Sequence, residues 1–429
     1  MSNPRKVAVK ALVKIEKDNA YSNITLNSIF KTAELKPVDK AFASALVYGV
    51  LDRRITLDFV LSRFMKTPIK KTAPFTLNVL RVALYQIMFM DKIPSSAAVN
   101  EAVKTVKASK ESRNAAFVNA VLRAALREEI SLPTGNSVKD LSIRYSCPEW
   151  IVESFLKDYG IENTVALLEE SLKTPPVILR VNTTKTTANA LKENLLQNGF
   201  ETKNTNSENY LILEKGGDIT SLEAFKNGEF YIQDTASQTA AETLAPKPND
   251  RVLDICAAPG GKSFTMACLM QNKGEIVACD LYEQRVGLIK DGASRLSLDI
   301  IKPTVSDATV FNEELGKFDC ILCDVPCSGL GVLRRKPDIK YKPKDDFSEL
   351  EEIQYSIFKN ALRYLKKGGR ILYSTCTLRR GENENLAKRV LEEYNDIVKV
   401  NEHTFMPHID NTDGFYLALF EKKEDGSLD

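Results

Sequence analysis

Residues 251–263 read RVLDICAAPGGKS, and this stretch decides the fold of the second half of the chain. Its first half is an apolar run of the kind that forms a buried strand, and its second half consists of small residues and paired glycines. Glycine lets a backbone approach a ligand closely, and the helix that follows such a turn presents free N–H groups at its start. The stretch therefore predicts a strand, a ligand-binding turn and a helix in succession.

Three interpretations of this turn are open from its residues alone. Gly261-Lys262-Ser263 matches the end of a P-loop, but that pattern requires glycine at position 256, where this chain has Cys256. A nucleoside-binding loop instead requires an acidic residue at the end of the next strand, and Asp280 stands 19 residues after Gly261, close to the usual offset. A tight turn without a ligand is the third interpretation. The position of Asp280 favours the nucleoside-binding loop.

Strand-like and helix-like segments alternate from residue 251 onward. Further strands are predicted at Glu275–Asp280, Lys302–Ser306, Phe318–Val325 and Arg370–Ser374, with helices at Glu283–Leu296 and Leu350–Leu365. This alternation is typical of a doubly wound, mostly parallel sheet, the α/β Rossmann-like fold class. Ligands of such sheets bind beyond the carboxyl ends of the strands.

Acidic residues and cysteines gather at those strand ends. The acids are Asp254, Asp280, Asp307 and Asp324. Cys327 and Cys376 lie in polar turns after the fourth and fifth strands, and adjacent strand ends can bring them into one cleft. The other cysteines of this half read as small buried apolar residues, and Cys320 and Cys323 point to opposite faces of one strand, so we predict no metal site.

The first third of the chain has a different character. Its apolar residues recur at helical spacing, and residues 1–130 hold 22 basic and 11 acidic residues, which leaves 37 basic and 46 acidic residues in the rest. A basic helical domain on an acidic body indicates a polyanion as partner, and a nucleic acid is favoured over a merely solvated helical surface. We divide the chain into a helical domain (1–132), a helical linker (133–169), a small α+β subdomain (170–230) and the α/β core (231–429).

Composition narrows the setting in which the protein works. No apolar run approaches the length of a membrane helix, and the start of the chain does not read as a signal peptide. Eight cysteines without a secretory signal fit a reducing compartment. We therefore expect a cytoplasmic protein without membrane contact, and we expect a monomer.

The motifs together resemble the RNA cytosine-5 methyltransferases of the Nol1/Nop2/Sun family. The resemblance rests on Val252–Ser263, on Phe318–Gly329 and on Thr375-Cys376, and it covers roughly residues 145–420. The first third resembles a NusB-type RNA-binding domain, a pairing that is characteristic of bacterial 16S rRNA methyltransferases. It implies a Rossmann-like methyltransferase core, S-adenosylmethionine as cofactor, 16S rRNA as partner and methylation of a cytosine at C5.

The resemblance also implies roles for individual residues. Cys376 is the expected nucleophile that adds to cytosine C6, Cys327 is expected to assist product release, and Asp324 is expected on the cytosine N3/N4 edge and near the cofactor. The cofactor would contact a set of residues at the strand ends, namely Cys256, Ala257, Ala258, Pro259, Gly260, Gly261, Lys262, Asp280, Asp307 and Asp324.

Several alternatives stay open at this point. The same chemistry on tRNA, a non-catalytic RNA-binding assembly factor and a P-loop NTPase acting on RNA each account for part of the pattern. Residues 334–338, RRKPD, suit either contacts to RNA phosphates or a solvated charged run.

Overall fold

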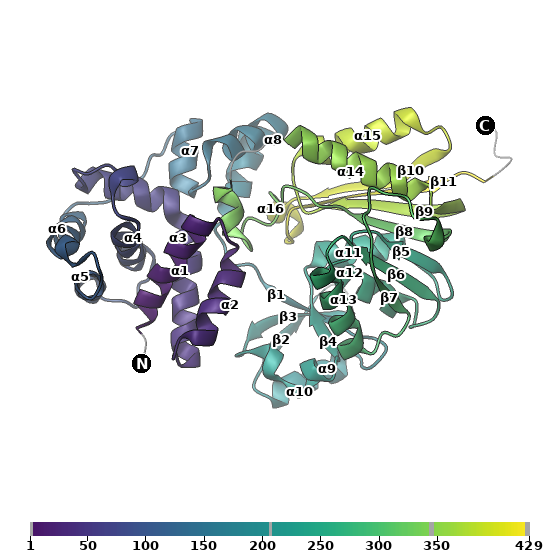
Figure 1. Cartoon of the computed structure of the whole chain (residues 1–429), viewed down its shortest axis with the longest axis horizontal. Helices are drawn as coiled ribbons and strands as arrows, with labels where there is room; N and C mark the ends of the chain where they lie inside the picture. Colours follow the sequence, from purple (N-terminus) through teal and green to yellow (C-terminus); the bar gives the residue numbers. More distant parts are fainter. Residues whose placement is uncertain (1–2, 206–207, 343–346, 425–429) are drawn as a thin grey trace. The chain divides into compact units, whose positions relative to one another are not determined.

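The computed structural model describes residues 3–205, 208–342 and 347–424, and the chain forms two compact units (Figure 1). The helical unit comprises Met1–Lys173 together with Leu333–Lys344. The sheet unit comprises Thr174–Val332 and Asp345–Asp429. Within the described ranges, no helix is both long enough and apolar enough to cross a membrane.

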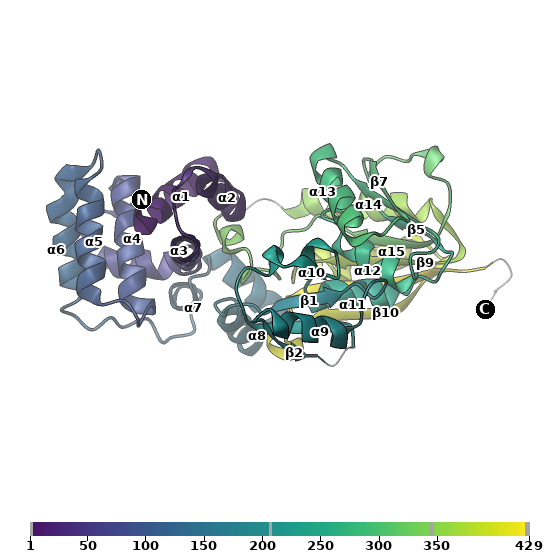
Figure 2. The same cartoon turned by 90° about the horizontal axis from the view of Figure 1, so that it is seen from below.

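The helical unit is built from helices, as the spacing of its apolar residues predicts, and one apolar core joins the helices of residues 4–125. The helices are α1 (Pro4–Asp18), α2 (Ser22–Thr32), α3 (Pro37–Phe64), α4 (Pro74–Phe89), α5 (Ser95–Lys107), α6 (Ala115–Ala125), α7 (Val138–Tyr145) and α8 (Glu149–Glu170). Pro4, Pro37 and Pro74 each occupy the first turn of a helix, where the missing N–H costs nothing. Figure 2 shows α4, α5 and α6 side by side.

The helical unit continues beyond residue 132. The Thr56 hydroxyl on α3 donates a hydrogen bond of 2.5 Å to the Ile143 carbonyl on α7. The Ile55 N–H donates to the Ser146 hydroxyl over 3.0 Å. Helix α7 therefore packs against α3, and α8 packs against α7. The four-part division of the chain drawn from sequence stays a prediction.

The segment 333–342 also packs within the helical unit. It contains the short helix η5 (Pro337–Tyr341), where Asp338 is buried and accepts a hydrogen bond of 2.9 Å from the Ser22 hydroxyl. The Tyr341 hydroxyl donates to the Leu51 carbonyl over 2.5 Å. From their sequence, residues 334–338 suit either contacts to RNA phosphates or a solvated run. Both interpretations are wrong for Pro337 and Asp338, because these residues are buried.

The small α+β subdomain opens the sheet unit. Its four-stranded antiparallel sheet has the order β2-β3-β1-β4. The elements are β1 (Val177–Val181), α9 (Ala188–Gln197), β2 (Glu201–Asn204), β3 (Tyr210–Lys215), α10 (Glu223–Lys226) and β4 (Phe230–Ile232).

A seven-stranded sheet of order β10-β11-β9-β8-β5-β6-β7 forms the core of the sheet unit in the described part of the chain. Its strands are β5 (Arg251–Asp254), β6 (Glu275–Asp280), β7 (Ile301–Val305), β8 (Phe318–Asp324), β9 (Leu365–Thr375), β10 (Ile397–Phe405) and β11 (Phe415–Lys422). The strands from β9 to β7 are parallel as predicted, whereas β11 pairs antiparallel with both β9 and β10. The sheet is therefore a parallel core extended at one edge by β10 and β11, two strands that the sequence analysis does not predict.

Helices cover both faces of this sheet (Figure 1). One apolar layer includes residues of α11 (Thr235–Leu244), α12 (Gly261–Leu269) and α13 (Glu283–Leu296). The other includes residues of α14 (Phe347–Leu362) and α15 (Glu384–Glu393). Cys320 packs in the first layer and Cys323 in the second, which confirms that they point to opposite faces.

A buried ion-pair cluster in the helical unit yields a stability prediction. Arg81 is 4% exposed, donates to both carboxylate oxygens of Asp58 over 2.7 Å, and reaches Glu16 over 2.5 Å. Arg81→Met removes the bidentate partner of Asp58 and one of the guanidinium groups that pair with Glu16, which keeps Arg54 at 3.2 Å. We therefore expect the free energy of unfolding of the helical unit to fall by about 3 kcal/mol. Urea unfolding followed by fluorescence measures this, because the only tryptophan, Trp150, lies in α8.

Lys104→Met is the matched control. Lys104 pairs with Glu101 over 2.9 Å, but its side chain is 73% exposed. Loss of such a pair changes stability by less than about 1 kcal/mol. Equal losses in the two variants would contradict the importance of the Arg81 cluster.

Candidate active site

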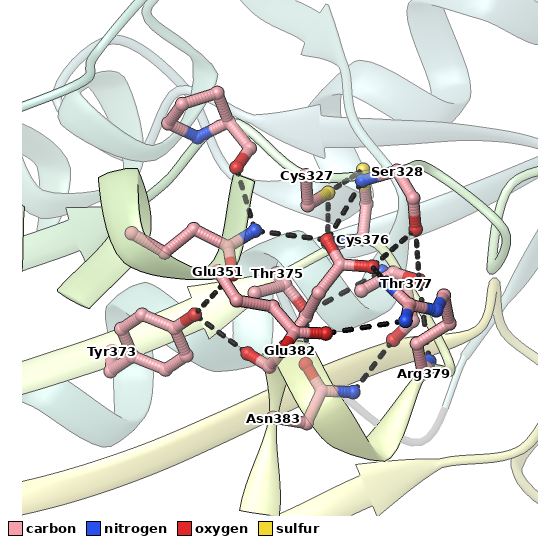
Figure 3. Close-up of polar contacts among 12 residues, drawn as sticks. Cys327, Ser328, Glu351, Tyr373, Thr375, Cys376, Thr377, Arg379, Glu382 and Asn383 are labelled. Atoms are coloured by element: carbon pink, nitrogen blue, oxygen red, sulfur yellow. Dashed lines mark hydrogen bonds and ion pairs between the residues drawn. The ribbon is translucent and has the colours of Figure 1, made fainter. Parts of the chain in front are cut away.

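Two cysteines meet beyond the ends of two neighbouring parallel strands. In the register of β8 and β9, Asp324 lies opposite Ser374, so the turns that carry Cys327 and Cys376 leave the same edge of the sheet. Their Sγ atoms are 3.0 Å apart, and the Cys376 N–H donates to the Cys327 sulfur over 3.3 Å (Figure 3). The structure thus brings together the two cysteines that the sequence places at adjacent strand ends.

The environment of Cys327 favours its protonated form. Its hydrogen bond with Cys376 raises the pKa of the Cys327 thiol well above its usual range. Burial and the negative charges of Cys376 and Glu382 raise it further. Cys327 is only half-buried, yet its thiol holds its proton more strongly than an ordinary half-buried thiol does.

An ion pair lies beside the two cysteines. Lys262 Nζ is 2.6 Å from Asp324 Oδ2, and the Ser374 hydroxyl donates to Asp324 Oδ1 over 2.8 Å. Burial alone would lower the pKa of Lys262, but the Asp324 carboxylate, with smaller contributions from Asp254 and Cys376, raises it above its usual value. A negative charge on Cys376 raises it as well, so Lys262 in turn stabilises a thiolate at Cys376.

Backbone hydrogen bonds hold the loop between β5 and α12 in place. The Ala257 N–H donates to the Cys279 carbonyl on β6, and the Gly260 N–H donates to the Ala257 carbonyl, both over 2.7 Å. Gly260 has a φ of 109°, and a Cβ there would lie 2.5 Å from the Phe264 ring. Glycine is therefore required at the point where α12 begins.

The four strand-end aspartates differ in their surroundings. Asp280 is buried, and the Tyr282 N–H lies 3.3 Å from its Oδ1 while Arg285 lies 3.4 Å from its Oδ2. Asp307 is exposed and accepts hydrogen bonds from the N–H and hydroxyl of Thr309. Asp254 is more deeply buried than Asp280, and Asp324 pairs with Lys262.

Asp254 carries an acceptor atom that the fold does not use. The Ser263 hydroxyl donates to its Oδ2 over 2.6 Å, whereas its Oδ1 is buried without a hydrogen-bond partner. Burial raises the pKa of Asp254 to about 7. Together with the Gly260 turn and the buried Asp280 carboxylate, this arrangement fits a nucleoside cofactor better than a turn that serves the fold alone.

The sequence interpretation missed a set of polar residues that surround the cysteines. They are Ser328, Gln354, Arg379, Glu382 and Asn383, and Figure 3 shows several of them converging on the two cysteine turns. Glu382 and Asn383 lie in a charged stretch that follows Cys376, and nothing in its sequence indicates that they are buried. The one feature of the sequence that could have pointed to them is their short distance from Cys376, six and seven residues.

Side chains of the kinds that bind metal ions do not form a metal site in the described part of the chain. Within residues 3–205, 208–342 and 347–424, no group of three His, Cys, Asp or Glu side chains could hold a metal ion. His403 lies 3.5 Å from Asp410 and against the Phe405 ring. Cys268, Cys279, Cys320 and Cys323 are buried in the core.

Comparison with known proteins identifies the family. The family "16S rRNA methyltransferase RsmB/F" matches residues 241–421, the NusB family matches residues 2–127, and a ferredoxin-like domain of RsmF/B-like methyltransferases matches residues 147–220. The probable ribosomal RNA small subunit methyltransferase B of Bacillus subtilis is 39% identical, over 98% of both chains. The chain belongs to the RsmB/F family. It is an S-adenosylmethionine-dependent rRNA methyltransferase with an all-α NusB domain and a Rossmann-like core.

Other relatives agree with this assignment to the RsmB/F family. The ribosomal RNA small subunit methyltransferase B of Escherichia coli O127:H6 is 31% identical, over 98% of this chain and 99% of that protein. The crystal structure of a methyltransferase homolog protein from Pyrococcus horikoshii matches with a TM-score of 0.61 and 28% identity, over 68% of this chain and all of that one. The resemblance inferred from the motifs is thereby confirmed at the level of family, fold and cofactor.

The buried carboxyl of Asp254 predicts a pH-dependent stability. Because folding raises its pKa from 3.8 to about 7, its stabilising contribution is present at low pH and is lost as the pH rises to about 7. Asp254→Asn removes this loss, so the variant should gain stability over the wild type between pH 5 and 8, by up to about 4 kcal/mol. Calorimetric melting of both proteins across that range measures the difference.

Asp307→Asn serves as the control, because Asp307 is exposed. We expect its melting curve to follow that of the wild type at every pH. If the melting temperatures of the wild type and of Asp254→Asn changed in parallel with pH, the prediction would be wrong, because Asp254 would then ionise as easily in the folded as in the unfolded chain.

Proposed function

We propose that the enzyme methylates C5 of a specific cytosine in 16S rRNA through a covalent bond between Cys376 and cytosine C6. The observation that carries this proposal is the contact of the Cys327 and Cys376 sulfurs at 3.0 Å beside the Lys262–Asp324 ion pair. The small-subunit rRNA methyltransferases among the relatives support 16S rRNA as the substrate class.

The chemistry explains why a thiolate is needed. Cytosine C5 is too weak a nucleophile to take a methyl group unaided. When the Cys376 thiolate forms a bond to C6 with its own electron pair, the C5–C6 double-bond pair moves onto C5. S-adenosylmethionine supplies the methyl group that C5 then acquires. Loss of the C5 proton to a base restores the double bond and returns the S–C6 pair to Cys376.

Electrostatics divides the roles of the two cysteines. Lys262 lies within electrostatic reach of Cys376, so the thiolate is favoured there. Cys327 is held in its thiol form by its surroundings. These charges support Cys376 as the nucleophile and Cys327 as the residue that assists release of the methylated product.

The remaining strand-end residues are assigned to binding. Asp324, held by Lys262 and Ser374, is suited to the N3/N4 edge of the cytosine. Asp280 is assigned to the ribose hydroxyls of the cofactor, Asp307 to the side of its adenine, and the loop of residues 256–262 to its methionine end.

The helical unit is proposed to bind the RNA around the target base. The first 130 residues carry an excess of basic side chains, which suits the phosphates of folded RNA. A base inside a helix hides its C6, so the target cytosine must be unpaired or turned out of its stack. We further propose that the enzyme acts as a monomer in the cytoplasm.

Transfer of a labelled methyl group from S-adenosylmethionine to unmodified 16S rRNA tests the proposed substrate. We expect 5-methylcytidine in 16S rRNA and none in tRNA assayed in parallel, as identified by mass spectrometry of the nucleosides. Label in tRNA alone would preserve the chemistry and overturn the substrate. Label at another atom of the base would overturn the chemistry.

Substitution of each cysteine tests the division of roles. Cys376→Ala should reduce methyl transfer to background, because no thiolate adds to C6. Cys327→Ala should instead form the bond to C6 and release product slowly, so a protein–RNA adduct accumulates on denaturing gels. Cys147→Ala, a buried cysteine of the helical unit, is the control with unchanged transfer. An active Cys376→Ala enzyme would contradict the mechanism.

A further inference from the structure

Glu382 is a buried carboxylate at the centre of the polar contacts around the two cysteines (Figure 3). Its Oε2 accepts hydrogen bonds of 2.9 Å from the Ser328 N–H and from the Gln354 side chain. Its Oε1 accepts from the Ser328 hydroxyl over 2.5 Å and from Arg379 over 3.2 Å. With four donors on two oxygens, this carboxylate is held in one position.

These contacts fix the turn that carries Cys327. Ser328 directly follows Cys327 and gives both its N–H and its hydroxyl to Glu382. Gln354 donates to Glu382 and also to the Pro326 carbonyl, over 2.9 Å in each case. The residues on both sides of Cys327 are thus tied, directly or through Gln354, to one carboxylate.

The neighbouring residue fixes the turn that carries Cys376. Asn383 accepts from the Thr375 hydroxyl over 2.6 Å and donates to the Thr377 carbonyl over 3.0 Å. The hydroxyls of Thr377 and Ser328 lie 2.7 Å apart and join the two turns. Glu382 and Asn383, consecutive in sequence, therefore hold the two cysteine turns against each other.

We propose that Glu382 is a positioning residue of the reaction: it holds the Cys327 turn against Cys376, and its charge keeps the shared proton on Cys327 while Cys376 is the thiolate. This inference rests on the proposed function for the roles of the two cysteines. It adds a carboxylate whose charge acts together with the Cys376 hydrogen bond and burial to keep the proton on Cys327.

The charged and titratable groups around the sulfurs agree with this assignment. Cys327 faces Cys376, Glu382 and the buried Tyr373, and the hydrogen bond to Cys376, burial and the charge of Glu382 together raise the pKa of its thiol. Burial and the charges of Glu382 and Cys327 raise the pKa of the Tyr373 hydroxyl, so it stays neutral. On the other side, Lys262 responds to the charge of Cys376. A negative group beside one sulfur and a positive group near the other separate two otherwise equal thiols.

Competitive alkylation of the full-length protein measures this separation without RNA or cofactor. Thiolates react with iodoacetamide and thiols do not, so the ratio of Cys376 to Cys327 modification, obtained by peptide mass spectrometry, reports which sulfur is ionised. Glu382→Gln keeps the size of the side chain and removes its charge. We expect the ratio to fall about tenfold, the effect of one pKa unit between the two thiols.

Two further variants separate the charge of Glu382 from its structural role. Arg379→Met removes the cation that pairs with Glu382 and should move the ratio in the opposite direction, toward Cys376. Glu351→Gln removes the other carboxylate that pairs with Arg379, 3.2 Å from its guanidinium, and should leave the ratio unchanged. General loosening of the site would move all three variants in the same direction.

The outcomes distinguish this inference from the proposed function. An unchanged ratio in folded Glu382→Gln, or a shift in the same direction for Arg379→Met, would overturn the role of Glu382 even if cytosine methylation is observed. Absence of 5-methylcytidine with the wild type would overturn the proposed function and leave the alkylation result standing. If Glu382→Gln fails to fold, the direction of the Arg379→Met shift still decides the question.

Discussion

The parallel pairing of β8 with β9 is the constraint on which the site depends. Asp324 and Ser374 face each other in that register, so the chain emerges from both strands at one edge and carries Cys327 and Cys376 into contact. A shift of one residue in either strand would turn its side chains to the opposite face of the sheet and separate the sulfurs. Burial of both faces of the sheet under helices specifies the register, because each strand must match two apolar layers.

Opposite charges beside the two sulfurs make this contact chemically useful. Two thiols in contact are equivalent unless their surroundings differ, and here Lys262 lies on the side of Cys376 while Glu382 lies on the side of Cys327. Both charged groups are themselves paired, Lys262 with Asp324 and Glu382 with Arg379. The pairing allows charges to remain in a poorly solvated site, where an isolated charge would lose its ionised state.

The sequence was sufficient for the parts of the site that follow local rules. The alternation of strands and helices predicts the Rossmann-like core, and the position of strand ends predicts that Cys327 and Cys376 meet. It was insufficient where burial depends on distant partners. Glu382 lies in a charged stretch that reads as exposed. Asp338 is buried and accepts a hydrogen bond from Ser22, 316 residues away in sequence. The antiparallel strand β10 is largely exposed and polar, so its pattern resembles a loop.

The identity of the attacking sulfur is the central claim, and trapping of the covalent intermediate tests it most directly. In 16S rRNA that contains 5-fluorocytidine, the fluorine at C5 cannot leave as a proton does, so the bond to the enzyme persists after methyl transfer. Digestion and mass spectrometry then locate the modified cysteine. The account predicts the nucleotide on the peptide that contains Cys376. A nucleotide on the peptide that contains Cys327, or none on either, would contradict it.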